Sequence, residues 1–60
     1  MNLKEFETTG QNKVLIDVDS ISSVRETTIN GRWATIVVMN RGEGYTLDGN
    51  IEDFKRKINM

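Results

Sequence analysis

The run from Trp33 to Met39 is the feature that most constrains the fold. It is the longest apolar stretch in the chain, and turn signals bound it at Asn30-Gly31 and at residues 40–44. Its β-branched middle predicts the central strand of a small sheet. Successive side chains point to opposite faces of a strand, and only Thr35 interrupts the apolar character. A strand that is apolar on both faces has to be covered on both faces.

Length and composition narrow the ways in which such a strand can be covered. The 60 residues form one domain at most, residues 1–60, and a chain this short buries only about 60% of the surface that it exposes when unfolded. Because Cys and His are absent, disulfides and ordinary zinc sites are excluded, and we expect no metal or cofactor. Oligomerisation remains as the usual aid to a small domain.

Charge and the N-terminal sequence bear on the partners and on the compartment. Eight basic against nine acidic residues give a net charge of −1, which argues against sequence-independent binding of nucleic acid. The N-terminus has no apolar signal-peptide core, and no apolar run approaches membrane-spanning length. We therefore expect a complete intracellular, cytoplasmic protein that keeps its starting Met.

The N-terminal part of the chain is expected to form a hairpin. Residues 3–8 alternate weakly, residues 9–12 form a cluster of turn residues, and residues 13–17 predict a second strand. The Asp17 and Asp19 carboxylates that follow lack the further acidic ligands and the Gly of a calcium-binding EF-hand loop. A tight turn, in which these side chains bond neighbouring backbone amides, is the expected structure.

A second hairpin should follow around Asn30-Gly31. Residues 21–29 alternate as a strand, and the Asn-Gly pair predicts a type I′ turn of two residues. A loop of this length fixes the register, so that Val24 should face Val37 and Arg25 should face Ile36. After the Gly-rich turn, Tyr45-Thr46-Leu47 is expected to return as a short final strand.

The chain ends in its one convincing helix pattern. Asn50 is a good N-cap, acidic residues follow it, and residues 55–57 are basic, which suits the helix dipole at both ends. The apolar stripe of this helix is Ile51, Phe54 and Ile58. We expect the stripe to pack on the sheet face that carries Ile36, Val38 and Leu47. The predicted fold class is α+β, a small twisted antiparallel sheet of four to five strands with one C-terminal helix on one face.

The opposite sheet face would then be bare. Its residues are Val24, Trp33, Val37 and Met39. Monomeric soluble proteins avoid exposing an apolar patch of this kind. We expect a second copy to cover the patch across a twofold axis, which makes the protein a homo-oligomer. Partial cover by the N-terminal hairpin, folded over this face, is the alternative.

Five side chains are candidates for binding a ligand. Trp33 and Tyr45 can stack on a planar group, and Arg25, Arg32 and Arg41 can bind phosphate or carboxylate through two parallel hydrogen bonds. Each also has a simpler interpretation as core, interface or solvated surface. Arg32 and Arg41 fall at opposite ends of the central strand, so that two subunits would be needed to bring them to one ligand.

Catalysis is not expected. General acid–base chemistry usually draws on His or on carboxylates in a pocket, and here His and Cys are absent and the carboxylates fall mostly in turns or in the first helical turn. Two non-enzymatic classes of function remain. One is a binding module for a small anionic, nucleotide-like ligand held between subunits. The other is a protein–protein adaptor or inhibitor that uses its apolar face or a free sheet edge.

A family resemblance extends from Lys13 to Ile58. The segments that carry it are the Asp19-Ser20-Ile21 turn, the Val24-Arg25-Glu26 strand, and the Tyr45-Thr46-Leu47 strand before the Asn50–Phe54 helix start. This pattern resembles the small FlbD-type proteins found beside bacterial flagellar genes, although Trp33 and the long turn after Met39 depart from it. The pattern is also similar to compact phage anti-defence proteins, including nucleotide-sequestering sponges.

The resemblance implies two alternative functions. One is a phage-type protein that sequesters a small nucleotide-like signal or blocks a host defence protein. The other is an FlbD-like bacterial adaptor or regulator. Neither implication extends to particular residues, because fold does not determine function.

Overall fold

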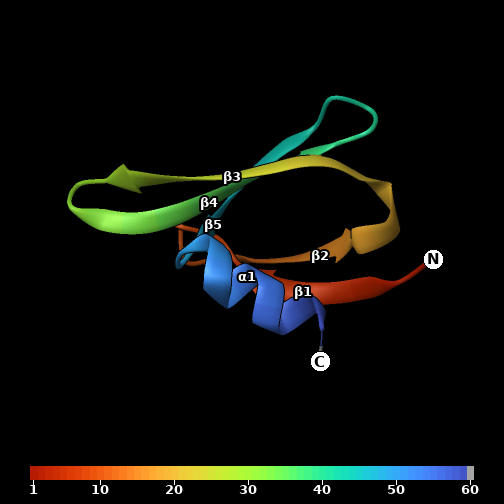
Figure 1. Ribbon diagram of the computed structural model, residues 1–60, viewed down its shortest axis with the longest axis horizontal. Helices are drawn as coiled ribbons and strands as arrows, with labels where there is room; N and C mark the ends of the chain where they lie inside the picture. Colours follow the sequence, from red (N-terminus) through yellow and green to blue (C-terminus); the bar gives the residue numbers. More distant parts are fainter. Residues whose placement is uncertain (60) are drawn as a thin grey trace.

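The computed structural model describes residues 1–59 and contains two antiparallel sheets followed by one helix (Figure 1). The elements are β1 Leu3–Glu7, β2 Lys13–Asp17, the 3-10 helix η1 Val18–Ser20, β3 Ile21–Ile29, β4 Arg32–Met39, β5 Gly44–Asp48 and α1 Ile51–Ile58. The predicted α+β class, the five strands and the C-terminal helix are confirmed. The strands divide into a β1–β2 sheet and a β3–β4–β5 sheet, where a single sheet was expected. No helix in residues 1–59 is long and apolar enough to cross a membrane.

The β3–β4 hairpin has the predicted register. Asn30 and Gly31 have φ values of 53° and 77°, which is the backbone geometry of a type I′ turn. Val24 faces Val37 and Arg25 faces Ile36, as the two-residue loop requires. One irregularity, between Ile21 and Ser23, shifts the pairing at the far end of β3.

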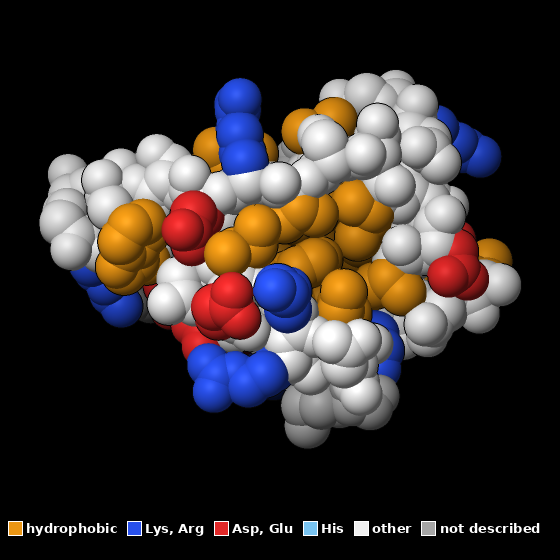
Figure 2. Space-filling model, in the orientation of Figure 1, with side chains coloured by type: hydrophobic (Ala, Val, Ile, Leu, Met, Phe, Trp, Pro, Cys, Tyr) orange, Lys and Arg blue, Asp and Glu red, His pale blue; other side chains and the backbone are white. Residues whose placement is uncertain are grey.

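The core lies between two layers. In Figure 1 the β3–β4–β5 sheet forms the upper layer, and β1, β2 and α1 form the lower one. The buried apolar side chains that meet between them are Phe6, Ile16, Val37, Met39, Leu47 and Phe54. Figure 2 shows hydrophobic side chains gathered in the middle of the molecule, between these layers. Val37 has no exposed surface, which places it at the centre of this core.

The sheet face predicted to carry the helix is wrong for Ile36 and Val38, whereas the predicted packing against Leu47 is confirmed. Phe54 packs in one cluster with Val37, Met39 and Leu47, on the face opposite Ile36 and Val38. The physical reason is the register of the β4–β5 hairpin, which places Leu47 opposite Thr35 and therefore on the Val37 side. The loop of residues 40–43 sets this register, and its sequence does not fix its geometry as Asn-Gly does.

The expected bare face is therefore the interior of a single chain. Val37 and Met39 are buried and Val24 is half-buried against them, so these side chains are covered within one chain. Phe6 and Ile16 of the N-terminal hairpin supply much of the cover, which was the alternative to a second copy. Only Trp33, at the end of the strand, stays exposed. The outer face of the sheet carries half-buried Ile36 and Val38, and no helix or strand lies over it in Figure 1.

Hydrogen bonds fix the N-terminal hairpin at both ends, and the one near its turn joins it to the large sheet. Near its turn, the Thr9 N–H donates to the Thr46 carbonyl of β5 at 3.1 Å. At its other end the Asp17 carboxylate accepts from the Asn2 N–H at 3.1 Å, from the Asp19 N–H at 3.2 Å and from the Ser20 hydroxyl at 3.0 Å. The predicted tight turn is confirmed. The bond from the Asn2 amide, with those from Ser20 and Asp19, lowers the pKa of Asp17.

Candidate functional site

A cleft opens where β4 begins, between β1, β5 and α1. It has a volume of about 520 Å³ and is lined by side chains from all four of these elements, among them the predicted site residues Arg32 and Trp33. A smaller cleft of about 440 Å³ adjoins it and shares Glu7, Arg32, Trp33 and Asp48. We call the larger one the Trp33 cleft. Its volume lies in the range of about 300–1,000 Å³ that is typical of small-molecule sites.

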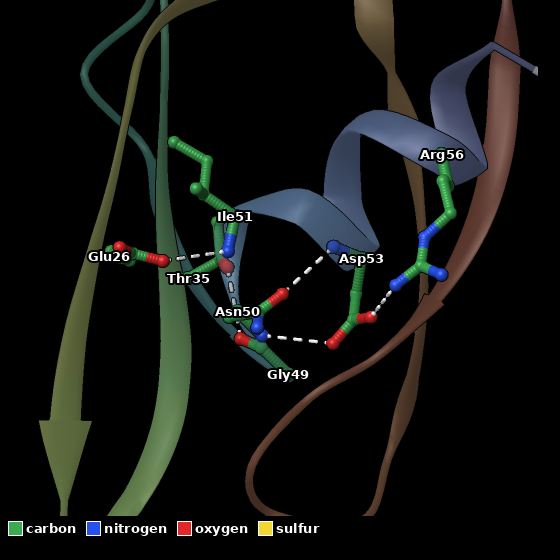
Figure 3. A network of polar contacts seen from close by, with 7 residues as sticks. All are labelled: Glu26, Thr35, Gly49, Asn50, Ile51, Asp53 and Arg56. Atoms are coloured by element: carbon green, nitrogen blue, oxygen red, sulfur yellow. Dashed lines mark hydrogen bonds and ion pairs between the residues drawn. The ribbon is translucent and has the colours of Figure 1, made fainter.

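A polar network fixes the wall of the Trp33 cleft at the start of α1 (Figure 3). The Asn50 side chain accepts from the Asp53 N–H at 2.9 Å, and the Asp53 carboxylate accepts from the Asn50 N–H at 3.1 Å. This reciprocal pair is a capping box, and it confirms the predicted N-cap. Arg56 forms an ion pair with the second Asp53 oxygen.

Two further hydrogen bonds join the same turn to the large sheet. The Ile51 N–H donates to the Glu26 carboxylate of β3 at 3.0 Å, and the Thr35 hydroxyl of β4 donates to the Gly49 carbonyl at 3.0 Å. Gly49 has a φ of 99°, and a Cβ there would lie 2.9 Å from an Asp53 carboxylate oxygen. Glycine is therefore required at this position. These two bonds tie the start of the helix to β3 and β4, beside the cleft.

The apolar part of the Trp33 cleft is aromatic. The Phe6 and Phe54 rings stack with centroids 5.3 Å apart and an interplanar angle of 21°. The Lys57 ammonium lies 5.4 Å from the Phe6 ring centroid, within range of a cation–π contact. Leu47 adds an aliphatic side chain that is 2% exposed. These side chains belong to the core, so the cleft is built on a rigid base.

Trp33 lies at the mouth of this cleft and is held there through its backbone. Its carbonyl accepts from the Gly49 N–H at 3.2 Å, while 53% of the residue remains exposed. The guanidinium of the preceding residue, Arg32, lies 3.9 Å from the Asp48 carboxylate, and both side chains are well exposed. An exposed ion pair at this distance contributes little to stability, so the Arg32 guanidinium can exchange its partner at low cost.

The charges around the Trp33 cleft are mixed. The cations are Arg32 and Lys57, and the carboxylates are Glu7, Asp48 and Asp53. Two positive and three negative groups give a net lining charge of −1. Such a lining does not favour a ligand with several phosphates, which would need a surplus of cations. It suits a ring with little or no net charge.

The other candidate ligand residues lie elsewhere. Arg41 and Tyr45 line a separate cavity of about 300 Å³ at the opposite end of β4, together with the exposed side chains of Leu3 and Leu15. Arg25 lies on the outer sheet face opposite Ile36. The single chain thus brings together Arg32 and Trp33 but distributes the three arginines over three places.

Sequence reasoning missed Phe6, Phe54 and Lys57 as cleft residues. Phe54 carried a signal, because it lies on the apolar stripe of the helix. Phe6 carried little, because β1 alternates weakly and its partner layer could not be known. In the part of the chain that the structure describes, no group of three or more Asp or Glu side chains is placed to hold a metal ion.

Comparisons with protein-family models, curated proteins and solved structures find no match to this chain. The functional argument therefore rests on the geometry of the Trp33 cleft and on the surfaces around it.

Proposed function

We propose that the protein is a non-enzymatic binding module that takes a planar, weakly charged ring, such as a nucleobase, in the Trp33 cleft. The observation that carries the proposal is a half-exposed indole at the mouth of a cleft with an aromatic base. Stacking of a base on an aromatic side chain contributes about 1–3 kcal/mol and tolerates any base, since every base has a π-face. The biological role that we propose is capture of a small nucleotide-like signal by a phage-type protein.

The polar rim narrows the class of ligand. Arg32 can supply one planar pair of donors to a single phosphate or to a carbonyl edge. The carboxylates of Asp48 and Glu7 lie in the same lining and oppose further negative charge. The site therefore suits a nucleoside or a monophosphate better than a triphosphate.

One observation favours the alternative, an FlbD-like adaptor or regulator that binds a protein. Leu3 and Leu15 are 51% and 61% exposed, and they lie diagonally across β1 and β2 on the outer side of the N-terminal hairpin. Exposed aliphatic pairs next to a cavity are common at protein–protein contacts. This surface is separate from the Trp33 cleft, so that the two proposals can be tested independently.

Fluorescence of Trp33 tests the proposal directly, because it is the only tryptophan in the chain. Titration with nucleosides and nucleoside monophosphates should quench the indole emission, and triphosphates should bind more weakly. Calorimetry should show that Arg32→Lys weakens binding of a monophosphate beyond the effect of charge, because Lys lacks the planar fork. Arg41→Lys is the matched control, because this exposed arginine lies in a different cavity, and it should bind as the parent does.

Two results would overturn the ligand proposal. One is the absence of quenching and of heat with every member of the panel at millimolar concentration. The other is an equal loss of binding in the Arg32 and Arg41 variants, which would show that the Trp33 cleft is not the site. Either result favours the adaptor.

A further inference from the structure

The outer edge of β3 is unpaired. Within residues 1–59 this strand of nine residues pairs only with β4. In a two-residue hairpin the residues that flank the turn, here Ile29 and Arg32, form a hydrogen-bonded pair. Every second residue of β3 therefore bonds β4, and the residues between them, Glu26 and Thr28, direct their N–H and C=O groups away from β4. In residues 1–59, none of these groups hydrogen-bonds the backbone of another segment. An edge of this kind is a template for an additional strand.

The turn end of this edge is also accessible. In Figure 1 the β3–β4 hairpin projects past α1, and the β1–β2 turn meets its tip only across the smaller cleft, on the side away from the β3 edge. Two apolar side chains remain open there, Ile29 at 41% and Trp33 at 53% exposure, one on each face of the sheet. Hydrophobic atoms are visible at this end of the molecule in Figure 2.

We propose that a second copy of this chain pairs antiparallel with the β3 edge, with Thr27 on a twofold axis normal to the sheet. Registers centred on Arg25 or on Glu26 would set like charges directly opposite each other, which is destabilising. The Thr27 register sets Thr27 against its own counterpart and Glu26 against Thr28, with no like charges opposite. It also stays within the regular part of β3, away from the irregularity between Ile21 and Ser23. The two copies then share one six-stranded sheet.

This pairing covers Ile29 and gathers arginines that one copy keeps apart. Ile29 faces Arg32 within its own hairpin, and in the Thr27 register it faces Arg25 of the second copy on its other side. Strands lie 4.7–4.9 Å apart, so the Cα atoms of the two arginines would be about 10 Å apart in one row. The stem of the second copy's Arg25 would lie over Ile29. The dimer thus has a basic row that one copy lacks, and its formation does not depend on the ligand of the Trp33 cleft.

A single cysteine tests the register, because the chain contains none. Across the axis Thr27 is a non-hydrogen-bonded pair, with Cα atoms about 4.5 Å apart, which a disulfide can span. Thr27→Cys should therefore be converted by oxidised glutathione into a covalent dimer of twice 6.8 kDa. Thr46→Cys is the matched control: it is a half-buried threonine on the same outer face, but in β5, and it should not be cross-linked.

Sedimentation gives a second, non-covalent readout. The parent chain should show a dimer that dissociates on dilution, Thr28→Pro should be monomeric because it removes an outward N–H, and Thr28→Val should associate as the parent does. Circular dichroism checks that the proline variant is folded. The proposal is overturned if the parent sediments only at 6.8 kDa at high micromolar concentration. Equal cross-linking of the two cysteine variants, or unchanged association of a folded Thr28→Pro, would also overturn it.

Discussion

The two faces of β4 differ far more in environment than in sequence. Val37 and Val38 are neighbours of the same type, yet Val37 has no exposed surface and Val38 is only half-buried. On the inner side, the N-terminal hairpin and α1 both pack over the strand; on the outer side, no helix or strand formed by residues 1–59 does. The burial of each face is therefore decided by where the flanking segments go, and apolar character alone does not reveal it.

The inner face should be the part of the molecule that is most sensitive to substitution. Phe54→Ala removes a ring that is 6% exposed and stacked on Phe6, and it should cost about 3–5 kcal/mol. For a domain of this size, that is a large part of the total stability. Thermal unfolding measures the loss, and Ile36→Ala on the outer face is the comparison, with a cost expected to be well below that of Phe54→Ala. Equal costs would show that the two faces are equally buried.

Loss of the hydrogen bond between the Ile51 N–H and the Glu26 carboxylate should have a smaller effect on stability. Glu26→Ala leaves the Ile51 N–H to water, and the expected cost is about 1 kcal/mol. Glu43→Ala is the matched control, because it makes the same change in the exposed β4–β5 loop, and it should change the free energy of unfolding little. If both variants unfold at the temperature of the parent, the Glu26 contact does not position the helix.

Acid should weaken the outer end of the N-terminal hairpin that covers the inner face. The hydrogen bond from Asn2, with those from Ser20 and Asp19, lowers the pKa of Asp17 below its ordinary value. A lowered pKa contributes stability that is fully present above the unfolded pKa of about 4 and is lost as the pH falls through the folded value. The melting temperatures of the parent and of Asp17→Asn should therefore differ at neutral pH and converge below about pH 4. A difference that stays constant across this range would contradict the assignment.

Much of this fold could be predicted from the sequence. The sheet face on which the helix packs could not, and the reason lies in the β4–β5 loop. The Asn30-Gly31 turn fixes the β3–β4 register because two residues leave one favoured geometry. The loop of residues 40–43 allows several geometries. The β4–β5 register that results decides on which face of the sheet Leu47 and the helix lie. The lining of the Trp33 cleft depends on this register, because Leu47 and Phe54 belong to it. Arg32 and Trp33 could be selected from the sequence, whereas Phe6 could be placed beside them only once the hairpin was seen to fold over the inner face.

The adjacent valines of β4 provide the most direct test of the difference between its faces. Val37→Ala should cost about 2 kcal/mol, since it removes fully buried methyl groups and leaves a cavity, and Val38→Ala should cost less than about 1 kcal/mol. The two variants share the strand, the residue type and the change in β-propensity, so that the difference in their free energies of unfolding reports the cover on each face. We expect Val37→Ala to cost more free energy of unfolding than Val38→Ala at every protein concentration. Equal costs, or a Val38 cost that grows with protein concentration, would contradict the account, because the outer face would then be buried against another copy.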